Sequence, residues 1–381
     1  MTSSVIRIMA ILEAESITGP AKAVLEFARE ARSSSNPRIE LSILTFLRGA
    51  EENMFIRRVR DENIPLDIVR EQGRFDRSVI DRLREAVARR KPHIIWTNAV
   101  KSHFLVRASG LHKQARWVAF HHGYTTTDWA TRMYNQLDRW SHPGARRVVT
   151  VCEAFARLIE KRGVARERIR VEYMPIRPST ERPPRARQTL RSHLQIEAGT
   201  IVLLSVGRLS KEKGHAELVR AVARIHRTEP ALPIRLLLVG DGPEAAPLKA
   251  LCRELKIESR VLFAGHQATV RDYYAAADIF VLPSHSEGSP NVLLEAIDAD
   301  LPIVATAVGG ISEMVGNEVE ALLVRRGDGE ALAGAITRLV HDEALRERLK
   351  SAGRKLLDRH TPEKFFRNLA TIFREVADSG P

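Results

Sequence analysis

Short apolar runs alternate with amphipathic stretches along most of the chain. Residues 5–12 are nearly apolar throughout, as are strands that a parallel sheet buries on both faces. Similar runs predict five more strands in the first half, at residues 39–46, 93–97, 116–120, 146–151 and 168–173. Amphipathic stretches predict helices at residues 21–31, 76–91, 131–140 and 153–162. This alternation is typical of a parallel sheet with helices on both faces.

Residues 174–185 interrupt the alternation with four prolines, which is typical of a linker. The pattern then restarts and predicts strands near residues 201–206, 234–239, 260–264, 278–282 and 302–306, with helices between them. We therefore predict an α/β protein with two Rossmann-like, doubly wound parallel-sheet domains. The predicted parts are a first domain at residues 1–175, a linker at 176–190, a second domain at 191–360 and a closing helix within 361–381.

The length of 381 residues agrees with two domains, because a single core rarely grows beyond about 250–300 residues. No apolar run approaches the ~18 residues of a membrane span, and the start of the chain leads directly into a strand. We therefore expect neither a signal peptide nor a transmembrane helix. The two cysteines, Cys152 and Cys252, form no metal-binding or disulfide pattern, so a reducing cytoplasm is the simplest location.

Positive charge is concentrated in the first half of the chain. Residues 1–190 carry 35 Lys and Arg against 21 Asp and Glu, a net charge of +14, whereas the remainder carries 25 against 26. Such asymmetry suggests a polyanionic partner or an anionic membrane surface for the first half. The predicted helix at 76–91 carries many of the arginines, but it lacks the large aromatics of membrane-surface helices. Solvated helix faces in an arginine-rich protein are the alternative.

Two acids, Glu287 and Glu295, lie on either side of the predicted start of a helix. An apolar strand ends at Leu282, and Pro290 suits a first helical position. The first N–H groups of that helix lack partners within it, so they would make an anion-binding mouth close to Glu287. The mouth is formed by Ser289, Pro290, Asn291 and Val292. Two acids beside it suit a ligand with both hydroxyls and phosphates, although a loop acid and a solvated helix position would show the same spacing.

Three more segments complete a pattern with Glu287 and Glu295. A buried strand leads into Gly309-Gly310, where a glycine pair lets backbone approach a ligand at the carboxyl edge of a parallel sheet. The other two are Ser205-Val-Gly-Arg-Leu-Ser-Lys-Glu-Lys-Gly and Val239-Gly-Asp-Gly-Pro-Glu. In this order and spacing the segments resemble the donor domain of the retaining family-four glycosyltransferases, also called glycosyl transferases group 1, which have the GT-B fold. The resemblance is specific over about residues 200–340 and looser elsewhere.

The resemblance implies a GT-B protein whose two domains face a central cleft, with the closing helix crossing back to the first domain. It implies that Arg208 and Lys213 neutralise the leaving diphosphate, so that no metal and no other cofactor is required. An arginine fork and a lysine point charge together suit a diphosphate. The resemblance also implies that Glu287 binds hydroxyls of the donor sugar and Glu295 those of the ribose. Further donor contacts are expected at Gly207, Gly265 and His266.

In the first domain, the candidates follow predicted strands at the carboxyl edge of the sheet. The family places one histidine here against the donor sugar and the reacting centre, and this chain offers His121 and His122. The glycine that follows favours His122, with His121 as the alternative; a purely structural histidine pair would look the same. Asn98 is an additional candidate. Gly19 would lie near the donor, although a proline follows it where relatives carry a second glycine.

We therefore expect a retaining, metal-independent hexosyltransferase that moves a sugar from a nucleotide-diphosphate sugar to a polysaccharide or lipid-linked glycan. Its expected partners are the nucleotide sugar, the glycan acceptor and an anionic membrane surface reached through the basic first half, with no nucleic acid. Its expected location is the cytoplasm, including the inner face of the membrane. Two alternatives use the same scaffold: a nucleotide-sugar epimerase and a catalytically silent nucleotide-sugar-binding relative.

Overall fold

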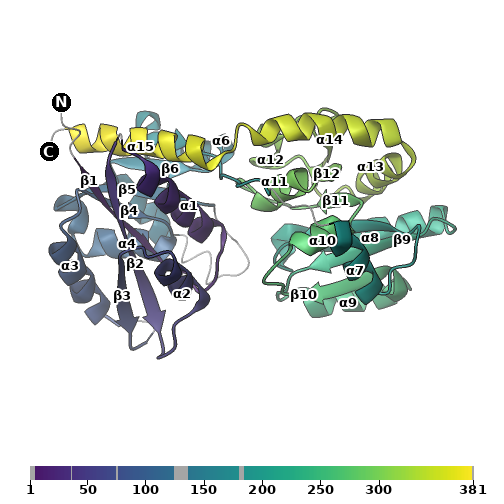
Figure 1. Ribbon diagram of the computed structural model, residues 1–381, viewed down its shortest axis with the longest axis horizontal. Helices are drawn as coiled ribbons and strands as arrows, with labels where there is room; N and C mark the ends of the chain where they lie inside the picture. The colour runs from purple at the N-terminus through teal and green to yellow at the C-terminus, as the bar shows by residue number, and fades with distance from the viewer. Residues whose placement is uncertain (1–4, 36, 74–75, 124–135, 180–183, 380–381) are drawn as a thin grey trace. The chain divides into compact units, whose positions relative to one another are not determined.

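A computed structural model describes residues 5–35, 37–73, 76–123, 136–179 and 184–379. The chain divides into two compact units (Figure 1). Unit 1 consists of Met1–Pro175 and His360–Pro381, and unit 2 of Ile176–Arg359. The chain therefore leaves unit 1 within the proline-rich segment and returns to it for its last helix.

Unit 1 is built on seven parallel strands in the spatial order β3-β2-β1-β4-β5-β6-β7. The strands are β1 (Ile6–Leu12), β2 (Ile39–Arg48), β3 (Leu66–Glu71), β4 (Ile94–Thr97), β5 (Arg116–His121), β6 (Arg147–Thr150) and β7 (Ile169–Val171). The central strands β1, β4 and β5 are buried along almost their whole length. Because both of their faces are covered, they appear in the sequence as unbroken apolar runs.

The apolar pattern did not predict the edge strand β3, and its chemistry explains why. Asp67, in the middle of β3, is 8% exposed. It accepts hydrogen bonds from Arg89 and Arg90, at the end of α3 (Ser78–Arg90), at 2.6 Å each. A strand that buries an acid against two arginines has neither an apolar run nor an apolar alternation. The sequence around it was therefore noted only for its arginines.

Helices cover both faces of the unit 1 sheet. On one face lie α1 (Gly19–Ser33), α2 (Met54–Asp61) and the closing helix α15 (Pro362–Asp378), and Figure 1 shows α15 beside α1. Phe27 of α1 packs against Phe366 and Phe373 of α15, with ring centroids 5.0 and 5.4 Å apart. On the other face lie α3, α4 (Val100–Ala108) and α6 (Glu153–Glu160). Of the predicted helix at 131–140, the first five residues lie outside the described part, and residues 136–141 are helical.

Unit 2 is built on six parallel strands in the order β10-β9-β8-β11-β12-β13. The strands are β8 (Ile201–Val206), β9 (Ile234–Val239), β10 (Val261–Gly265), β11 (Ile279–Leu282), β12 (Ile303–Thr306) and β13 (Leu322–Val324). The helices are α7 (Pro184–His193), α8 (His215–Thr228), α9 (Ala245–Glu254), α10 (Arg271–Ala276), α11 (Asn291–Asp298), α12 (Ile311–Met314), α13 (Gly329–His341) and α14 (Glu343–Leu357). None of the helices in the described part of the chain is both long enough and apolar enough to cross a bilayer.

Two elements of unit 2 differ from the sequence prediction. Helix α7 occupies part of the predicted linker, and it is tied to the domain because Arg187 and Arg191 each pair with Asp278 at 2.5 Å. The three-residue strand β13 was not predicted, because so short a run carries no period. The other unit 2 strands lie within one residue of the predicted ranges.

Both sheets are wound in the same way. The chain adds strands to one side of the first strand and then crosses to the other side, so the order reverses between β1 and β4 in unit 1 and between β8 and β11 in unit 2. Ligands of open parallel sheets bind at the carboxyl ends of the strands where the order reverses. These two reversal points are therefore the places where we expect the candidate residues to meet a ligand.

Candidate functional site

In unit 2 a lysine and a glutamate meet across the reversal point. Lys213 ends the short helix η4 (Lys211–Lys213) after β8, and Glu287 lies in the loop after β11. Lys213 Nζ donates to Glu287 Oε1 at 2.7 Å, and Ser284 Oγ donates to the same oxygen at 2.6 Å. Glu287 is 8% exposed, while the lysine side chain is 26% exposed. An accessible cation beside an anchored carboxylate can bind a phosphate and a hydroxyl group at one place.

Two glycines make this arrangement sterically feasible. Gly214 has φ +65°, and a Cβ there would lie 2.0 Å from the carbonyl oxygen of Pro283. Gly309 has φ +49°, and a Cβ there would lie 2.0 Å from the carbonyl oxygen of Glu287. The neighbouring Gly310 N–H donates to that same oxygen at 3.1 Å. The turns after β8 and β12 can therefore approach the loop after β11 only with glycine at these positions.

Helix α11 begins beside this loop. Pro290 is its N-cap, with φ −72° and ψ 110°, and not its first helical residue as the sequence suggested. No side chain caps the helix, so its first N–H groups stay available to an anion. Of the mouth residues, Pro290 is buried and Ser289, Asn291 and Val292 are half-buried. This helix start is the part of the site suited to phosphate oxygens.

Glu295 is held by a residue that the sequence analysis did not identify. Tyr274 of α10 donates its hydroxyl to Glu295 Oε2 at 3.0 Å. Burial and the neighbouring Glu295 raise the pKa of Tyr274 well above its ordinary value, so the hydroxyl remains a donor at all physiological pH values. The tyrosine lies 21 positions before the glutamate, outside every motif, and only the packing of α10 against the sheet brings the two together.

The remaining donor-side candidates lie at the same strand ends but make fewer contacts. Arg208, two residues after β8, is exposed, and so is His266, just after β10. A Cβ added at Gly207 or at Gly265 would meet nothing within 4 Å, so the space above both backbones is open. These positions form the accessible rim of the unit 2 site.

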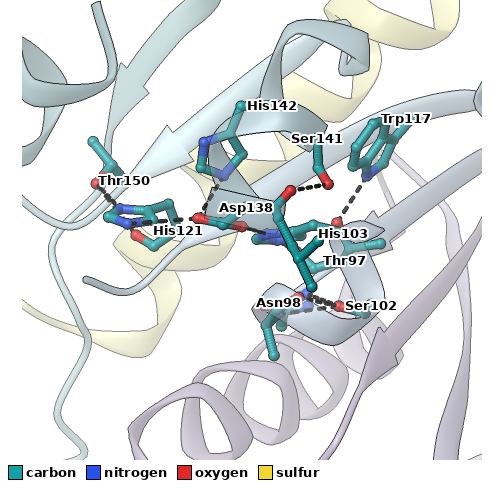
Figure 2. Close-up of polar contacts among 12 residues, drawn as sticks. Thr97, Asn98, Ser102, His103, Trp117, His121, Asp138, Ser141, His142 and Thr150 are labelled. Carbon is teal, nitrogen blue, oxygen red and sulfur yellow. Dashed lines mark hydrogen bonds and ion pairs between the residues drawn. The ribbon is translucent and has the colours of Figure 1, made fainter. Parts of the chain in front are cut away.

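In unit 1 the candidates Gly19 and His122 are half-buried, whereas Asn98 and His121 are buried. His122 Nε2 lies 3.3 Å from Asn98 Oδ1, and the imidazole stacks on Phe120 with centroids 4.3 Å apart. His121 is only 2% exposed and lies within a buried polar cluster (Figure 2). Gly19 is the first residue of α1, which begins two residues earlier than predicted because Pro20 suits the first turn of a helix.

His121 and His122 have similarly lowered pKa values, although the groups around them differ. Burial, reinforced by the neighbouring His103, lowers the pKa of His122 to about 3. Burial also lowers the pKa of His121 to about 3, although Asp138 acts in the opposite direction. Both imidazoles are therefore neutral near pH 7. His122, which is half-buried, can donate or accept one hydrogen bond with a ligand without changing charge.

Two doubly wound parallel sheets, one of them with a cation, an acid and a helix start at its reversal point, define the GT-B type of α/β protein. Residues 186–356 match the family described as glycosyl transferases group 1, and residues 18–173 match the glycosyl transferase 4-like domain. Over these two ranges the chain therefore has a group 1 glycosyltransferase domain and a glycosyl transferase 4-like domain. The resemblance that the sequence motifs indicated is thereby confirmed.

Individual relatives match mainly in part of the chain. The lipopolysaccharide core biosynthesis glycosyltransferase LpsD of Rhizobium meliloti is 40% identical over 174 residues, which cover 46% of this chain and 49% of LpsD. LpsE of the same organism is 37% identical over 167 residues, 44% of this chain and 47% of LpsE. The chain thus aligns with about half the length of these relatives. The fold is similar to that of HepE from Anabaena in complex with UDP-glucose, with a TM-score of 0.83 at 20% identity, covering 97% of this chain and 100% of that chain.

Proposed function

We propose that the protein is a retaining, metal-independent glycosyltransferase that moves a hexose from a nucleotide-diphosphate sugar to a polysaccharide or lipid-linked glycan. The observation that carries the proposal is the pair of Lys213 and Glu287 at the reversal point of the unit 2 sheet, beside the start of α11. The two family matches support the transferase activity. The relatives from lipopolysaccharide core biosynthesis support a glycan acceptor.

The leaving diphosphate is the group that this site suits best. Its departure leaves negative charge, which preorganised positive groups and N–H donors stabilise more in the transition state than in the ground state. Lys213, the exposed Arg208 and the uncapped start of α11 all lie at the carboxyl edge of the unit 2 sheet. Because the protein supplies this positive charge, we propose that the diphosphate leaves without a divalent ion.

Glu287 acts in this proposal as a binding group and not as a nucleophile. Its Oε1 already accepts two hydrogen bonds, neither of which uses Oε2, so Oε2 can accept from a hydroxyl of the donor sugar. A two-carboxylate hydrolysis mechanism needs a second acid across the scissile bond. The second acid of the motif, Glu295, is instead held by Tyr274, and we assign it to the ribose hydroxyls. Attack from the face that the diphosphate leaves, with a phosphate oxygen taking the acceptor's proton, would retain the anomeric configuration.

Calorimetric titration with UDP, GDP and ADP in the presence of a chelator tests the donor site. We expect one nucleotide to bind, and Lys213→Ala to weaken that binding at least about tenfold, which corresponds to about 1.4 kcal/mol. The control is Lys211→Ala, which removes an exposed lysine of the same short helix and should leave the affinity unchanged. Binding that requires magnesium would contradict metal independence. An epimerised nucleotide sugar formed without acceptor would favour an epimerase, and NMR of the transfer product decides whether the anomeric configuration is retained.

We also propose that the acceptor carries negative charge. A cavity of about 700 Å³ lies at the carboxyl ends of β2 and β3 in unit 1, and Arg48, Arg70 and Arg82 line it. The acid in its lining, Glu71, is already paired with Arg48 at 3.0 Å. A positively charged cavity raises the local concentration of an anionic ligand, as a phosphorylated or lipid-linked glycan is. The same charge would favour contact with an anionic membrane surface.

Acceptor kinetics at low salt test this part of the proposal. We expect Arg70→Ala and Arg82→Ala to raise the acceptor KM while the donor affinity stays unchanged, because both arginines belong to unit 1. The control is Arg38→Ala, whose side chain is 67% exposed and lies just before β2, at the opposite edge of the sheet. An acceptor KM unaffected by both cavity variants would contradict the assignment. Sedimentation with neutral and anionic liposomes tests the membrane contact separately.

A further inference from the structure

Four side chains with metal-binding chemistry meet in the interior of unit 1 (Figure 2). His103 comes from α4, His121 ends β5, Asp138 lies in the helical segment 136–141, and His142 begins the short helix η2 (His142–Gly144). Asp138 is 0% exposed, His103 1%, and the other two histidines 2%. Imidazole nitrogens and a carboxylate are common zinc ligands in proteins. Apart from His121, the alternative to His122, the cluster contains none of the donor-site candidates and none of the residues of the arginine-lined cavity.

The partners of the two His103 nitrogens determine which of them carries the hydrogen in the neutral imidazole. His103 Nε2 lies 3.3 Å from the carbonyl oxygen of Thr97, which can only accept, so Nε2 carries the hydrogen. His103 Nδ1 lies 2.5 Å from Asp138 Oδ1. In the neutral imidazole, the lone pair of Nδ1 would face a carboxylate oxygen, so a positive charge must lie at this contact, either a proton between the two atoms or a metal ion bound by both side chains. Metal-bound histidines characteristically donate their other N–H to a backbone carbonyl or carboxylate, as His103 does here.

The second carboxylate oxygen of Asp138 also lies close to a histidine nitrogen. His142 Nε2 lies 3.3 Å from Asp138 Oδ2. Among the described residues, neither of these two buried atoms has a hydrogen-bond partner. Leaving buried polar atoms unsatisfied is costly. Around tetrahedral zinc with bonds of about 2.0–2.2 Å, neighbouring ligand atoms lie about 3.3–3.5 Å apart, which is the separation of His142 Nε2 from Asp138 Oδ2, whereas His103 Nδ1 lies closer to Oδ1, at 2.5 Å.

We propose that His103, Asp138 and His142 bind a zinc ion as a structural centre of unit 1. The ligand atoms of the three residues lie within 4.8 Å of one another. His121 Nε2, which lies 3.9 Å from Asp138 Oδ2, is the further imidazole beside them. Two nitrogens and one carboxylate favour zinc over magnesium or calcium, which prefer all-oxygen shells. The ion would fasten α4, the segment 136–141 and η2 together, and it has no part in neutralising the donor diphosphate.

Metal analysis of the full chain tests the proposal. The protein is produced without a histidine tag in zinc-supplemented medium, because a buried site fills during folding, and its zinc content is measured by mass spectrometry after gel filtration. We expect about one zinc ion per chain. Asp138→Asn and His142→Gln, which preserve side-chain size, should lower the content at least about tenfold. The control is His341→Gln, which removes an exposed imidazole with an acidic partner, Glu229, at 2.7 Å and should keep the full content.

Circular dichroism identifies variants that fail to fold, and a second measurement on the unmodified chain covers that case. Protein refolded with zinc should melt at a higher temperature than protein refolded with chelator or with magnesium, because a ligand that binds only the folded state stabilises it. Wild-type protein that refolds in zinc without holding it, or folded variants that keep a full zinc content, would overturn the proposal. A proton would then bridge His103 and Asp138, and the nearby positive charge of Arg162 would explain the exclusion of the ion.

Discussion

The buried carboxyl group of Glu172 makes the stability of unit 1 depend on pH. Glu172 directly follows β7 and is 8% exposed. Its Oε1 accepts one hydrogen bond from Asn368 Nδ2 of α15 at 3.2 Å, which only partly offsets the loss of water. Burial raises the pKa of Glu172 from 4.5 to about 8. In the unfolded chain the same group would titrate near its ordinary value.

The sign and the size follow from these two values. The folded state binds the proton of Glu172 more tightly than the unfolded chain does, so protonation of Glu172 stabilises the folded state. This stabilisation is complete below pH 4.5 and is lost as the pH rises towards 8. At about 1.4 kcal/mol per pKa unit, the loss has an upper limit of about 5 kcal/mol. Glu172→Gln keeps the acceptor for Asn368 but does not titrate. We therefore expect the variant to be more stable than wild type above pH 8, by an amount that shrinks as the pH falls to 5.

Tryptophan fluorescence during urea unfolding measures this effect in unit 1 alone. All four tryptophans lie there, at positions 96, 117, 129 and 140. Unfolding curves at pH values between 5 and 9 give the stability difference between wild type and Glu172→Gln. The control is Glu167→Gln, which changes an exposed acid five positions earlier and should keep the wild-type pH profile. Parallel profiles for wild type and Glu172→Gln would refute the reasoning, because Glu172 would then be ionised in the native state.

Three further predictions concern the unit 2 site. Gly309→Ala should destabilise unit 2 by at least about 1–3 kcal/mol in calorimetric unfolding. The new Cβ would collide with the Glu287 carbonyl oxygen, and the backbone at this position has a positive φ. An unchanged melting temperature would contradict the close contact. Lys213→Ala should destabilise unit 2 by about 1–3 kcal/mol, and adding Glu287→Gln should restore stability but not nucleotide binding, since the first change leaves a buried carboxylate poorly paired. Tyr274→Phe should weaken nucleotide binding about tenfold in calorimetric titration, because it removes a hydrogen bond that positions Glu295; an unchanged affinity would contradict the assignment of that acid to the ribose.

The sequence predicted the parts of the fold whose signal is local. The central strands are buried on both faces, so each one appears as an apolar run, and the α/β class with two parallel sheets is confirmed. Apart from β13, which is too short to carry a period, the elements that were missed have a tertiary partner in place of a local pattern. β3 buries Asp67 against arginines of α3, and α7 is held to unit 2 by arginines that bind Asp278. Neither pairing can be read from spacing along the chain.

The site residues also divide into those that local sequence could predict and those that it could not. Lys213 and Glu287 could be expected near each other, because both follow strands that flank a reversal point, and the structure brings them to 2.7 Å. The role of Tyr274 could not be expected, because its helix lies on the other side of β11 in the sequence. The residues of the buried cluster come from α4, β5 and the stretch before β6, with spacings that match no metal-binding motif.

The carboxyl edges of the two sheets, although they share a topology, are built for different tasks. In unit 2 the edge consists of close backbone approaches at Gly214 and Gly309 and a lysine that remains accessible, so room is left for a ligand. In unit 1 much of the edge is filled by buried side chains, among them His121 and Asp138. Substitutions of polar side chains at the unit 2 edge should therefore lower ligand affinity as well as stability. At the buried part of the unit 1 edge the main loss should be of stability, because a buried polar group that loses its partner has no access to water.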